Sequence, residues 1–279
     1  CPVWVFEANP DGAPCEVLGG DNVAIFPLEL PGTVRHYYFA DKVWACAWAE
    51  DLAVSQTGSL PHGRVGTLVN GRVQSLAWLA PDCLVIQPPA LFALGPEWDA
   101  AVRPVHVRNV GPRAGESLDP FWRGVYAAVG VQDVETRTES FVDGERLRAY
   151  YNSHGFAIDP ALGLLRRWAR AFQTLVVDGA FQAAACHDGR HQVFLHQAVL
   201  SALLATAVDP GRIRLLPPEY NYPYNLHTAV PKERRARALN DLVCIAYEDR
   251  SLDPEAVEDI AIEEPLRSWL AGRQVAGAG

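Results

Sequence analysis

The sequence predicts an α/β fold in which helices flank a mixed, mostly parallel sheet. Strand-like runs of β-branched and aromatic residues alternate along the chain with segments of helical periodicity. Hydrophobic residues make up 49% of the 279 residues and charged residues 20%, which is typical of a globular protein with a sizeable core. No linker-like stretch divides the chain, so we expect one domain over residues 1–279.

The expected elements follow from local patterns. Strand-like runs are bounded by Gly, Asp or Pro, and expected helices carry apolar residues at a spacing of three or four. A turn is expected at Asn70-Gly71, and Asp159-Pro160 is a typical helix start. We expect strands in residues 2–8, 22–30, 76–79, 102–111, 149–159, 212–216 and 241–247, and helices in 38–54, 160–175, 191–207 and 263–273.

The charge balance limits the classes of partner. The sequence has 24 basic and 33 acidic residues, a net charge of −9. A nucleic-acid backbone is therefore an unfavourable partner, because the mean field repels it. A ligand that carries phosphate needs a local basic pocket or a metal ion. The run KERRAR (232–237) is interpreted either as a solvated helix face or as a group that attracts a diphosphate.

Cysteine usage and hydropathy indicate a cytoplasmic protein without a transmembrane segment. The six cysteines lie far apart and include no Cys-x-x-Cys pair, so neither zinc-site spacing nor a disulfide framework is indicated. The longest nearly apolar stretch, residues 193–208, is too short to span a bilayer and contains His196 and Gln197. It predicts a buried helix.

Five segments, taken in order, carry the chemical signal. They are FADKVWACAWAEDLA (39–53) leading to AWLAPDCLVIQPPALFAL (77–94), YYNSHGFAIDPALGLLRRW (150–168), FLHQAVLSALL (194–204) and LLPPEYNYP (215–223). This order resembles the GT-A fold of nucleotide-sugar glycosyltransferases, in particular the glycogenin-like and galactosyltransferase-like members. The likeness covers about residues 36–247. It implies transfer of a sugar from a nucleotide-sugar donor to a carbohydrate acceptor.

The departures from that family fall at polar site positions. An Asp-x-Asp pair holds Mn²⁺ or Mg²⁺ in the family, whereas Ala80 stands here in place of the first acid and only Asp82 is present. His196 replaces the acid of an Asp-Gln pair, and Ala246 stands where a histidine often completes the metal site. The metal site is therefore weakened. A catalytically inactive, glycosyltransferase-like protein that binds carbohydrate or nucleotide is the alternative function.

The resemblance implies a role for each candidate residue, and each has a structural alternative. Asp82 would bind the metal or act in catalysis, or it shapes a turn after Pro81. His196 would be catalytic, or it is a satisfied core histidine. Asn152 and Gln197 would face the donor sugar, or they bond to backbone.

The loop PPEYNYPYNLH (217–227) joins rigid aromatic rings to amide groups, the kind of surface on which sugars and bases bind. Tyr220 and Asn221 are its candidate binding residues. The alternative is a proline-stiffened loop packed by its own tyrosines. His106 and Arg108 would meet a phosphate, or they are solvated strand residues. The sequence contains no Gly-x-Ser-x-Gly elbow, which disfavours a hydrolase.

Overall fold

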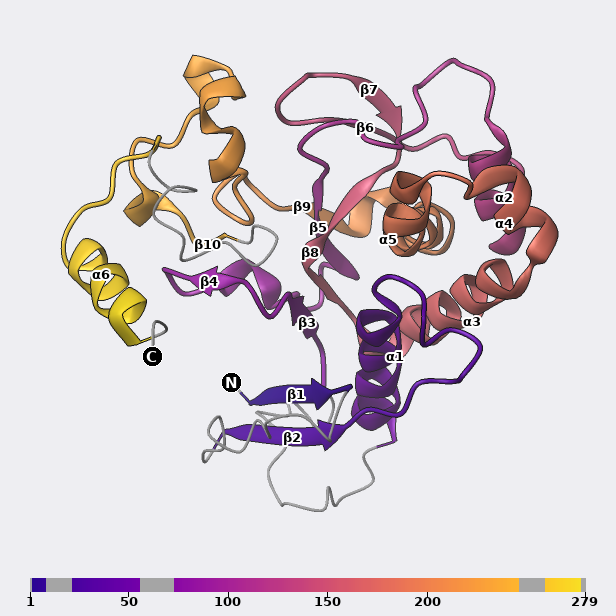
Figure 1. The fold of residues 1–279 in the computed structure, drawn as a ribbon, viewed down its shortest axis with the longest axis horizontal. Coiled ribbons are helices and arrows are strands. Elements are labelled where there is room, and N and C mark those ends of the chain that lie inside the picture. Colours follow the sequence, from indigo (N-terminus) through magenta and orange to yellow (C-terminus); the bar gives the residue numbers. More distant parts are fainter. Residues whose placement is uncertain (1, 9–21, 56–72, 246–258, 277–279) are drawn as a thin grey trace.

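The computed structural model describes residues 2–8, 22–55, 73–245 and 259–276. Its architecture is mixed α/β, with helices and several small sheets. Figure 1 shows helices α1–α5 gathered on one side of the central sheet, while β10 and α6 lie on the other side. The α-helices are α1 (Ala40–Val54), α2 (Pro120–Ala128), α3 (Leu164–Val177), α4 (Gly179–Ala185), α5 (Gly189–Ala207) and α6 (Leu266–Ala276). Within the described residues, no helix combines the length and the apolar character that a bilayer crossing needs.

The strands form one four-stranded sheet and three two-stranded sheets among the described residues. The central sheet has the order β3-β8-β5-β9, and the pairs are β1-β2, β4-β10 and β6-β7. The strands are β1 (Val3–Glu7), β2 (Val23–Pro27), β3 (Leu76–Leu79), β4 (Leu84–Val85), β5 (Ala100–Pro104), β6 (Arg137–Glu139), β7 (Arg146–Arg148), β8 (Tyr151–Ile158), β9 (Ile213–Leu215) and β10 (Cys244–Ile245).

The expectation of a mostly parallel sheet is wrong. β8 lies between β3 and β5 and runs antiparallel to both, so β5 and β9 form the one parallel pair of the central sheet. The alternation of strands and helices does not specify strand direction, because each strand can enter the sheet from either end. β8 follows the short β6-β7 hairpin rather than a helical crossover, and it enters the sheet in the opposite direction.

Strand β8 is irregular at its centre. Ala157 pairs with Ala101, yet Asn152 pairs with Arg103, so residues 153–156 of β8 lie opposite Val102 alone. This bulge leaves part of the β8 backbone without a partner in β5. Its polar groups are therefore available to side chains from the helices, and the candidate site described below is built around it.

The main core lies between the sheet and helices α1, α3 and α5. As expected, α3 buries Leu165, Trp168, Phe172 and Leu175 on one face. The expected helix start at Asp159-Pro160 is a 3₁₀ turn instead, and Leu162, which is partly buried, belongs to that turn. α3 begins after Gly163, whose left-handed φ of 62° interrupts the helix.

Most other expected elements are present with boundaries shifted by a few residues. The helices expected in 38–54, 191–207 and 263–273 correspond to α1, α5 and α6, and each expected strand is present at least in part. The KERRAR run is not a helix face, because only Lys232–Arg234 form a 3₁₀ turn. Asn70-Gly71 and residues 246–247 lie outside the described residues. Helices α2 and α4 and the short strands β4, β6 and β7 were not expected.

Candidate functional site

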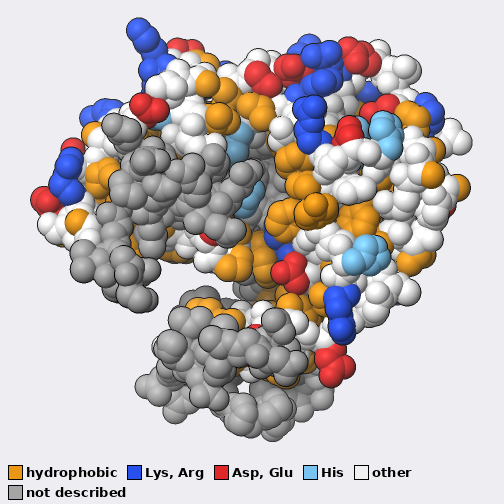
Figure 2. Space-filling model, viewed as in Figure 1, with side chains coloured by type: hydrophobic (Ala, Val, Ile, Leu, Met, Phe, Trp, Pro, Cys, Tyr) orange, Lys and Arg blue, Asp and Glu red, His pale blue; other side chains and the backbone are white. Residues whose placement is uncertain are grey.

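The candidate site lies where β3 and β5 end and β8 begins. Asp82 follows β3, Arg103 lies near the end of β5, and Asn152 is the second residue of β8 and pairs with Arg103. The parallel strands β5 and β9 end at this same edge of the sheet. In open α/β sheets, ligands bind beyond the carboxyl ends of parallel strands. Figure 2 shows hydrophobic side chains gathered along the middle of the face that it presents, with histidines among them.

Lys42 is the central cation of this region. The side chain is 5% exposed, and its Nζ lies 3.3 Å from the carbonyl oxygen of Ser153, to which it donates. Nζ also lies 3.5 Å from Nε2 of His196. The ammonium group stands over the ring of Phe39, 4.7 Å from its centroid, and 5.9 Å from that of Trp78. Lys42 therefore supplies donors to the β8 bulge.

Burial controls the charge of Lys42. Desolvation lowers its pKa to about 8, and the nearby groups Cys46, Asp41 and Asp82 oppose that shift. No carboxylate of the described residues forms an ion pair with Lys42. A buried amine of this kind remains partly protonated near neutral pH.

Phe39 holds this arrangement from the start of α1. It has a left-handed φ of 59°, which is unusual for a bulky residue, and no side chain caps the helix there. The ring lies 4.3 Å from that of His196, between centroids, so it covers both His196 and Lys42. A left-handed backbone costs about 1–3 kcal/mol at a residue such as Phe39, and the contacts of its ring with His196 and Lys42 offset this cost.

Ser153, His196 and Gln197 form a buried network between β8 and α5. Nδ1 of His196 donates to the carbonyl oxygen of Val193 at 2.8 Å, so Nε2 is an acceptor and lies 2.9 Å from Oγ of Ser153. Oε1 of Gln197 accepts from both N and Oγ of Ser153, each at 3.2 Å. His196 is 3% exposed, and burial together with Lys42 holds its pKa well below the usual range. These contacts favour a positioning role for both residues.

Asn152 and His154 lie on either side of Ser153 in β8. Oδ1 of Asn152 accepts from the backbone N of His154 at 2.8 Å and lies 3.0 Å from its Nδ1. Burial, followed by the charge of Lys42, lowers the pKa of His154 to about 4, while Asp82 opposes the shift. Asp82 therefore lies within electrostatic reach of both Lys42 and His154, and its side chain is partly exposed.

Tyr220 and Asn221 occupy different environments from those expected for a surface loop. The hydroxyl of Tyr220 accepts from the backbone N of Leu91 at 2.8 Å, and its ring packs edge-on against Phe92. Tyr220 thus ties the 217–227 loop to the segment after β4. Asn221 is 3% exposed, has a left-handed φ of 59°, and its two side-chain polar atoms have no hydrogen-bond partner in the described structure.

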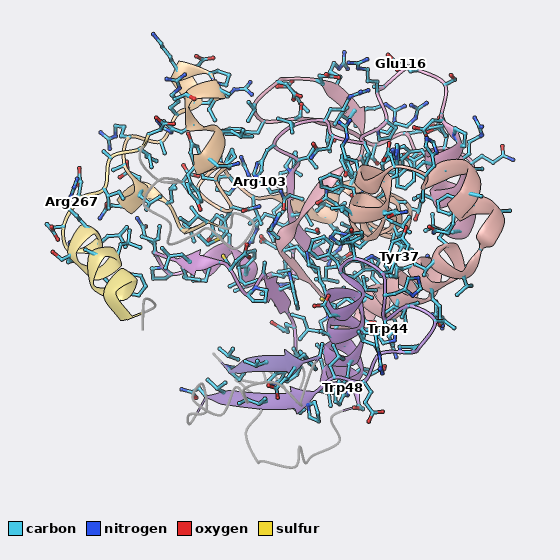
Figure 3. All side chains as sticks on the ribbon, viewed as in Figure 1. Tyr37, Trp44, Trp48, Arg103, Glu116 and Arg267 are labelled. Carbon is cyan, nitrogen blue, oxygen red and sulfur yellow. The ribbon has the colours of Figure 1, made fainter. Side chains whose placement is uncertain are left out.

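Lys42, Ser153 and Arg103 were not among the residues expected from the sequence. A signal was present for two of them, because Lys42 and Arg103 are each the one basic residue of a run that is apolar apart from one aspartate, FADKVWACAWA and DAAVRPV. A charged residue on a buried face needs a partner or a ligand. Figure 3 places Arg103 in the middle of the molecule, where the central sheet meets the C-terminal segments.

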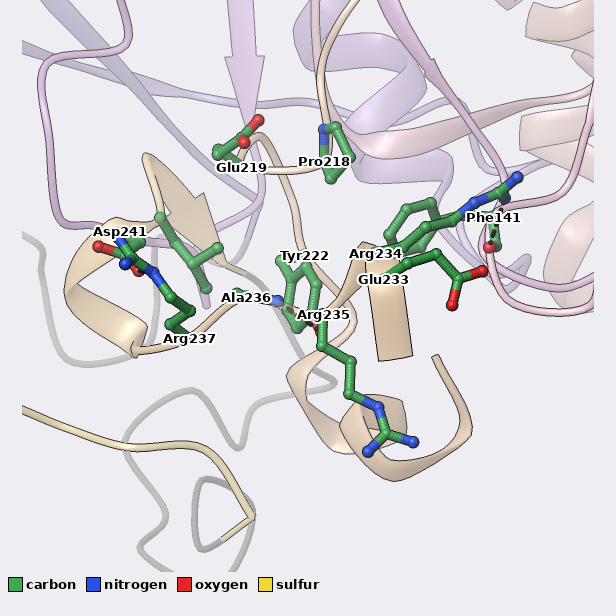
Figure 4. Close-up of a pocket in the computed structure, with 11 residues that line it drawn as sticks. Phe141, Pro218, Glu219, Tyr222, Glu233, Arg234, Arg235, Ala236, Arg237 and Asp241 are labelled. Atoms are coloured by element: carbon green, nitrogen blue, oxygen red, sulfur yellow. Dashed lines mark hydrogen bonds and ion pairs between the residues drawn. The ribbon is translucent and has the colours of Figure 1, made fainter. Parts of the chain in front are cut away.

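A cavity of about 780 Å³ lies beside Phe141, whose ring contacts the guanidinium of Arg103 (Figure 4). Its wall includes Phe141, Glu219 and Tyr222, together with arginines of the 234–237 segment. Those arginines are engaged: Arg234 lies 3.3 Å from Glu139, and Arg235 donates to carbonyl oxygens of Val230 and Thr228. A volume of this size accommodates a nucleotide or a disaccharide.

The residues present do not fit the divalent metal that the resemblance implies. Asp82 is a single carboxylate, Ala80 offers no ligand, and the ammonium group of Lys42 lies within electrostatic reach of Asp82. No group of three or more His, Cys, Asp and Glu in the described ranges could hold a metal ion. Ala246 lies outside those ranges. We derive no chemical step through a metal.

Comparison of the sequence with protein-family models and with curated proteins gives no match.

Proposed function

We propose that this protein is a glycosyltransferase that transfers a sugar from a nucleotide-sugar donor to a carbohydrate acceptor. One observation supports the proposal above others: Asp82, Lys42, Asn152 and His154 come together at the sheet edge where β3 and β5 end. They derive from segments that lie far apart in the sequence. A cation, a partly exposed carboxylate and an amide are the groups that a charged, hydroxyl-rich ligand requires.

The reaction breaks the bond between the anomeric carbon and the diphosphate and forms a bond from that carbon to an acceptor oxygen. In the proposed site, Lys42 offsets negative charge on the departing diphosphate. Asp82 accepts the proton of the acceptor hydroxyl, because it is the partly exposed carboxylate of the group. Asn152 and His154 contact the donor sugar. Ser153, His196 and Gln197 hold the β8 bulge in position from the core side.

The second candidate function is a protein that binds the same ligands without catalysis. The contacts of His196 favour it, because both ring nitrogens have protein partners and neither is available to an acceptor hydroxyl. Ala80 favours it as well. The two functions share the site and differ in whether the donor is consumed.

The experiment is a panel of UDP-, GDP- and ADP-sugars screened by thermal shift, with and without Mn²⁺, followed by chromatography of the nucleotide released in the presence of sugar acceptors. The transferase is expected to release nucleotide diphosphate from one donor in an acceptor-dependent manner. Stabilisation by a donor without release identifies the binding protein. If no donor stabilises the protein and none is consumed, both functions are wrong.

A matched pair of variants tests the site. Lys42→Met removes the proposed counter-charge, whereas Arg123→Met removes an exposed cation on α2 that bonds only to the carbonyl oxygen of Leu118 among described groups. Donor binding is expected to weaken about 10-fold or more in Lys42→Met, because hydrogen bonds to charged groups contribute about 1.5–3 kcal/mol. It is expected to stay unchanged in Arg123→Met. Equal effects of both substitutions would place the donor elsewhere.

A further inference from the structure

Arg103 and Asn221 are among the buried polar side chains of the described structure that have atoms without hydrogen-bond partners. Each is 3% exposed. Nε and Nη2 of Arg103, and both Oδ1 and Nδ2 of Asn221, have no partner. Buried polar atoms are paired in the great majority of cases, and an unpaired guanidinium is among the least favourable groups to bury. Phe141, over whose ring Arg103 lies, and Tyr222, which follows Asn221 in the chain, both line the cavity of Figure 4.

The two side chains share one environment. Arg103 lies within electrostatic reach of Glu219 and Tyr222, the residues on either side of the Tyr220-Asn221 pair, and of Cys244. The backbone N of Asn221 donates to the carbonyl oxygen of that same Cys244 at 2.8 Å. Arg103 and Asn221 therefore both lie near Cys244 of β10, although they are far apart in the sequence.

The guanidinium of Arg103 is held without being neutralised. It lies over the ring of Phe141, 4.4 Å from the centroid, and Phe141 packs edge-on against Tyr222. No carboxylate of the described residues pairs with it, and Glu219 supports its charge only from a distance. Burial lowers the pKa of Arg103 to about 10, so it stays charged at neutral pH.

His106 adds a third group to the same place. Its Nδ1 is buried and has no partner in the described structure, and it lies within electrostatic reach of Arg103 and His154. Burial and the charge of Arg103 hold the pKa of His106 well below the usual range, so the ring is neutral. His106 therefore lies within electrostatic reach both of Arg103 and of His154 in the candidate site.

We propose that Arg103 and Asn221 form a subsite for a phosphate group, with the guanidinium and the side-chain amide as donors. This inference rests on the proposed function, because the bound phosphate group belongs either to the donor nucleotide or to a phosphorylated acceptor. The fork of guanidinium N–H groups matches two oxygens of a phosphate, and Asn221 adds an amide donor beside it. Phe141, Glu219 and Tyr222 line the cavity, and Phe141 contacts Arg103, so the proposed route of the ligand runs from the cavity past the Phe141 ring.

The left-handed backbone of Asn221 allows a precise test. Asn221→Gly removes the amide and keeps the conformation, because glycine adopts a φ of 59° without strain. Arg103→Met removes the charge and keeps an apolar side chain over Phe141. A purely structural role predicts that both variants lose stability. A ligand-binding role predicts that both are as stable as the wild type without ligand, or more so, since each removes unpaired buried groups.

The measurement is isothermal titration calorimetry of the full chain with inorganic pyrophosphate, then with UDP, GDP and glucose 6-phosphate. Arg103→Met is expected to weaken pyrophosphate binding about 10- to 100-fold and Asn221→Gly about 10-fold. Arg235→Gln, which removes another guanidinium from the cavity wall, is expected to leave binding within about twofold. Tighter binding of UDP or GDP than of glucose 6-phosphate assigns the phosphate to the donor, and the reverse order assigns it to the acceptor.

The inference is overturned if the wild type binds none of these phosphates, or if Arg103→Met binds pyrophosphate as tightly as the wild type. It is also overturned if binding follows Arg235 instead of Arg103. Arg103-dependent pyrophosphate binding without any nucleotide-sugar turnover supports the subsite while contradicting a transferase. Turnover of a nucleotide sugar that is indifferent to Arg103 supports the transferase and removes the subsite.

Discussion

Oγ of Ser153 lies 2.9 Å from Nε2 of His196, and this contact joins the bulge of β8 to helix α5. Because Nδ1 of His196 donates to the carbonyl oxygen of Val193, Nε2 can only accept. Ser153 also reaches Oε1 of Gln197, and Lys42 reaches the carbonyl oxygen of Ser153. Ser153 thus contacts the side chains of His196, Gln197 and Lys42 at the bulge.

Ser153→Ala is expected to lower the free energy of unfolding by about 1–3 kcal/mol, because the buried Nε2 of His196 and Oε1 of Gln197 lose the single hydroxyl donor that they share. Urea unfolding monitored by tryptophan fluorescence measures the change. Thr174→Ala is the matched control, since it removes an exposed hydroxyl that bonds to the carbonyl oxygen of Arg170, and it should change stability by less than about 0.5 kcal/mol. Similar losses in the two variants would contradict the importance of the network.

The lowered pKa of Lys42 predicts that the free energy of unfolding increases at alkaline pH. Burial lowers its pKa from the ordinary 10.5 to about 8 in the folded state. As pH falls from 10.5 to 8, the unfolded chain takes up a proton that the folded chain does not, so stability falls, and the loss is complete below pH 8. The free energy of unfolding of the wild type relative to Lys42→Met should therefore rise by up to about 3 kcal/mol between pH 7.5 and 10.5.

The comparison with Lys42→Met isolates this effect from the tyrosines and cysteines that titrate in the same range. Lys232, the only other lysine of the sequence, is exposed and serves as the control. Urea unfolding of Lys232→Met should track the wild type at every pH. A Lys42→Met difference that stays constant between pH 7.5 and 10.5 would show that Lys42 keeps its ordinary pKa.

Glu50 lies in α1 and caps the start of a different helix, α3. Its fully buried carboxylate accepts from the backbone N of Leu165 and of Arg166, each at 3.0 Å, at the start of α3. The Nε of Arg166 also donates to it at 3.0 Å. α3 has no side-chain cap of its own, since Gly163 occupies that position. Glu50 therefore satisfies free N–H groups of α3 and carries the charge that the helix dipole favours.

Glu50→Gln is expected to destabilise the protein by about 1–3 kcal/mol, because one carboxylate oxygen becomes an amide that faces other donors. Asp51→Asn changes the adjacent carboxylate, which is exposed and lies 3.2 Å from Nη1 of the same Arg166. Its expected loss is below about 0.5 kcal/mol, as for exposed ion pairs. Thermal unfolding followed by circular dichroism separates the two. A larger loss in Asp51→Asn would be inconsistent with the capping role of Glu50.

Asp82 tests the proposed chemistry. If its carboxylate accepts the proton of the acceptor hydroxyl, Asp82→Asn should lower the rate of sugar transfer by about 10²- to 10⁴-fold while donor affinity changes little. Glu97→Gln, at an exposed position shortly before β5, should leave the rate unchanged. Nucleotide release measured at saturating donor provides the rate. Full activity of Asp82→Asn would exclude Asp82 as the base.

Several elements were predictable from sequence because their patterns are local. The apolar spacing of α3 identified Leu165, Trp168, Phe172 and Leu175 as its buried face, and β-branched and aromatic runs located β1 and β2. The same patterns did not place the start of α3. Asp159 does accept from a backbone N, yet it caps a 3₁₀ turn, because the left-handed Gly163 ends that turn before the helix.

The candidate residues were recognised in part. Asp82, Asn152, His196 and Gln197 do lie in one neighbourhood, which Lys42 and His154 connect. Their roles stay predictions. Tyr220 was expected to meet a ligand, whereas its hydroxyl is engaged by the backbone of Leu91. A motif identifies residue types, and it does not reveal which atoms of those residues are already bonded.

The sequence alone determined where most of the helices and strands form, and which segments carry polar groups into an apolar setting. Only the tertiary structure decided the direction of β8, the bulge at its centre, and the burial of Lys42 and Arg103. The reason is that backbone propensity and apolar spacing act over a few residues. Strand pairing and desolvation depend instead on groups brought together by the whole chain, as Lys42 is brought to Ser153 from 111 positions away.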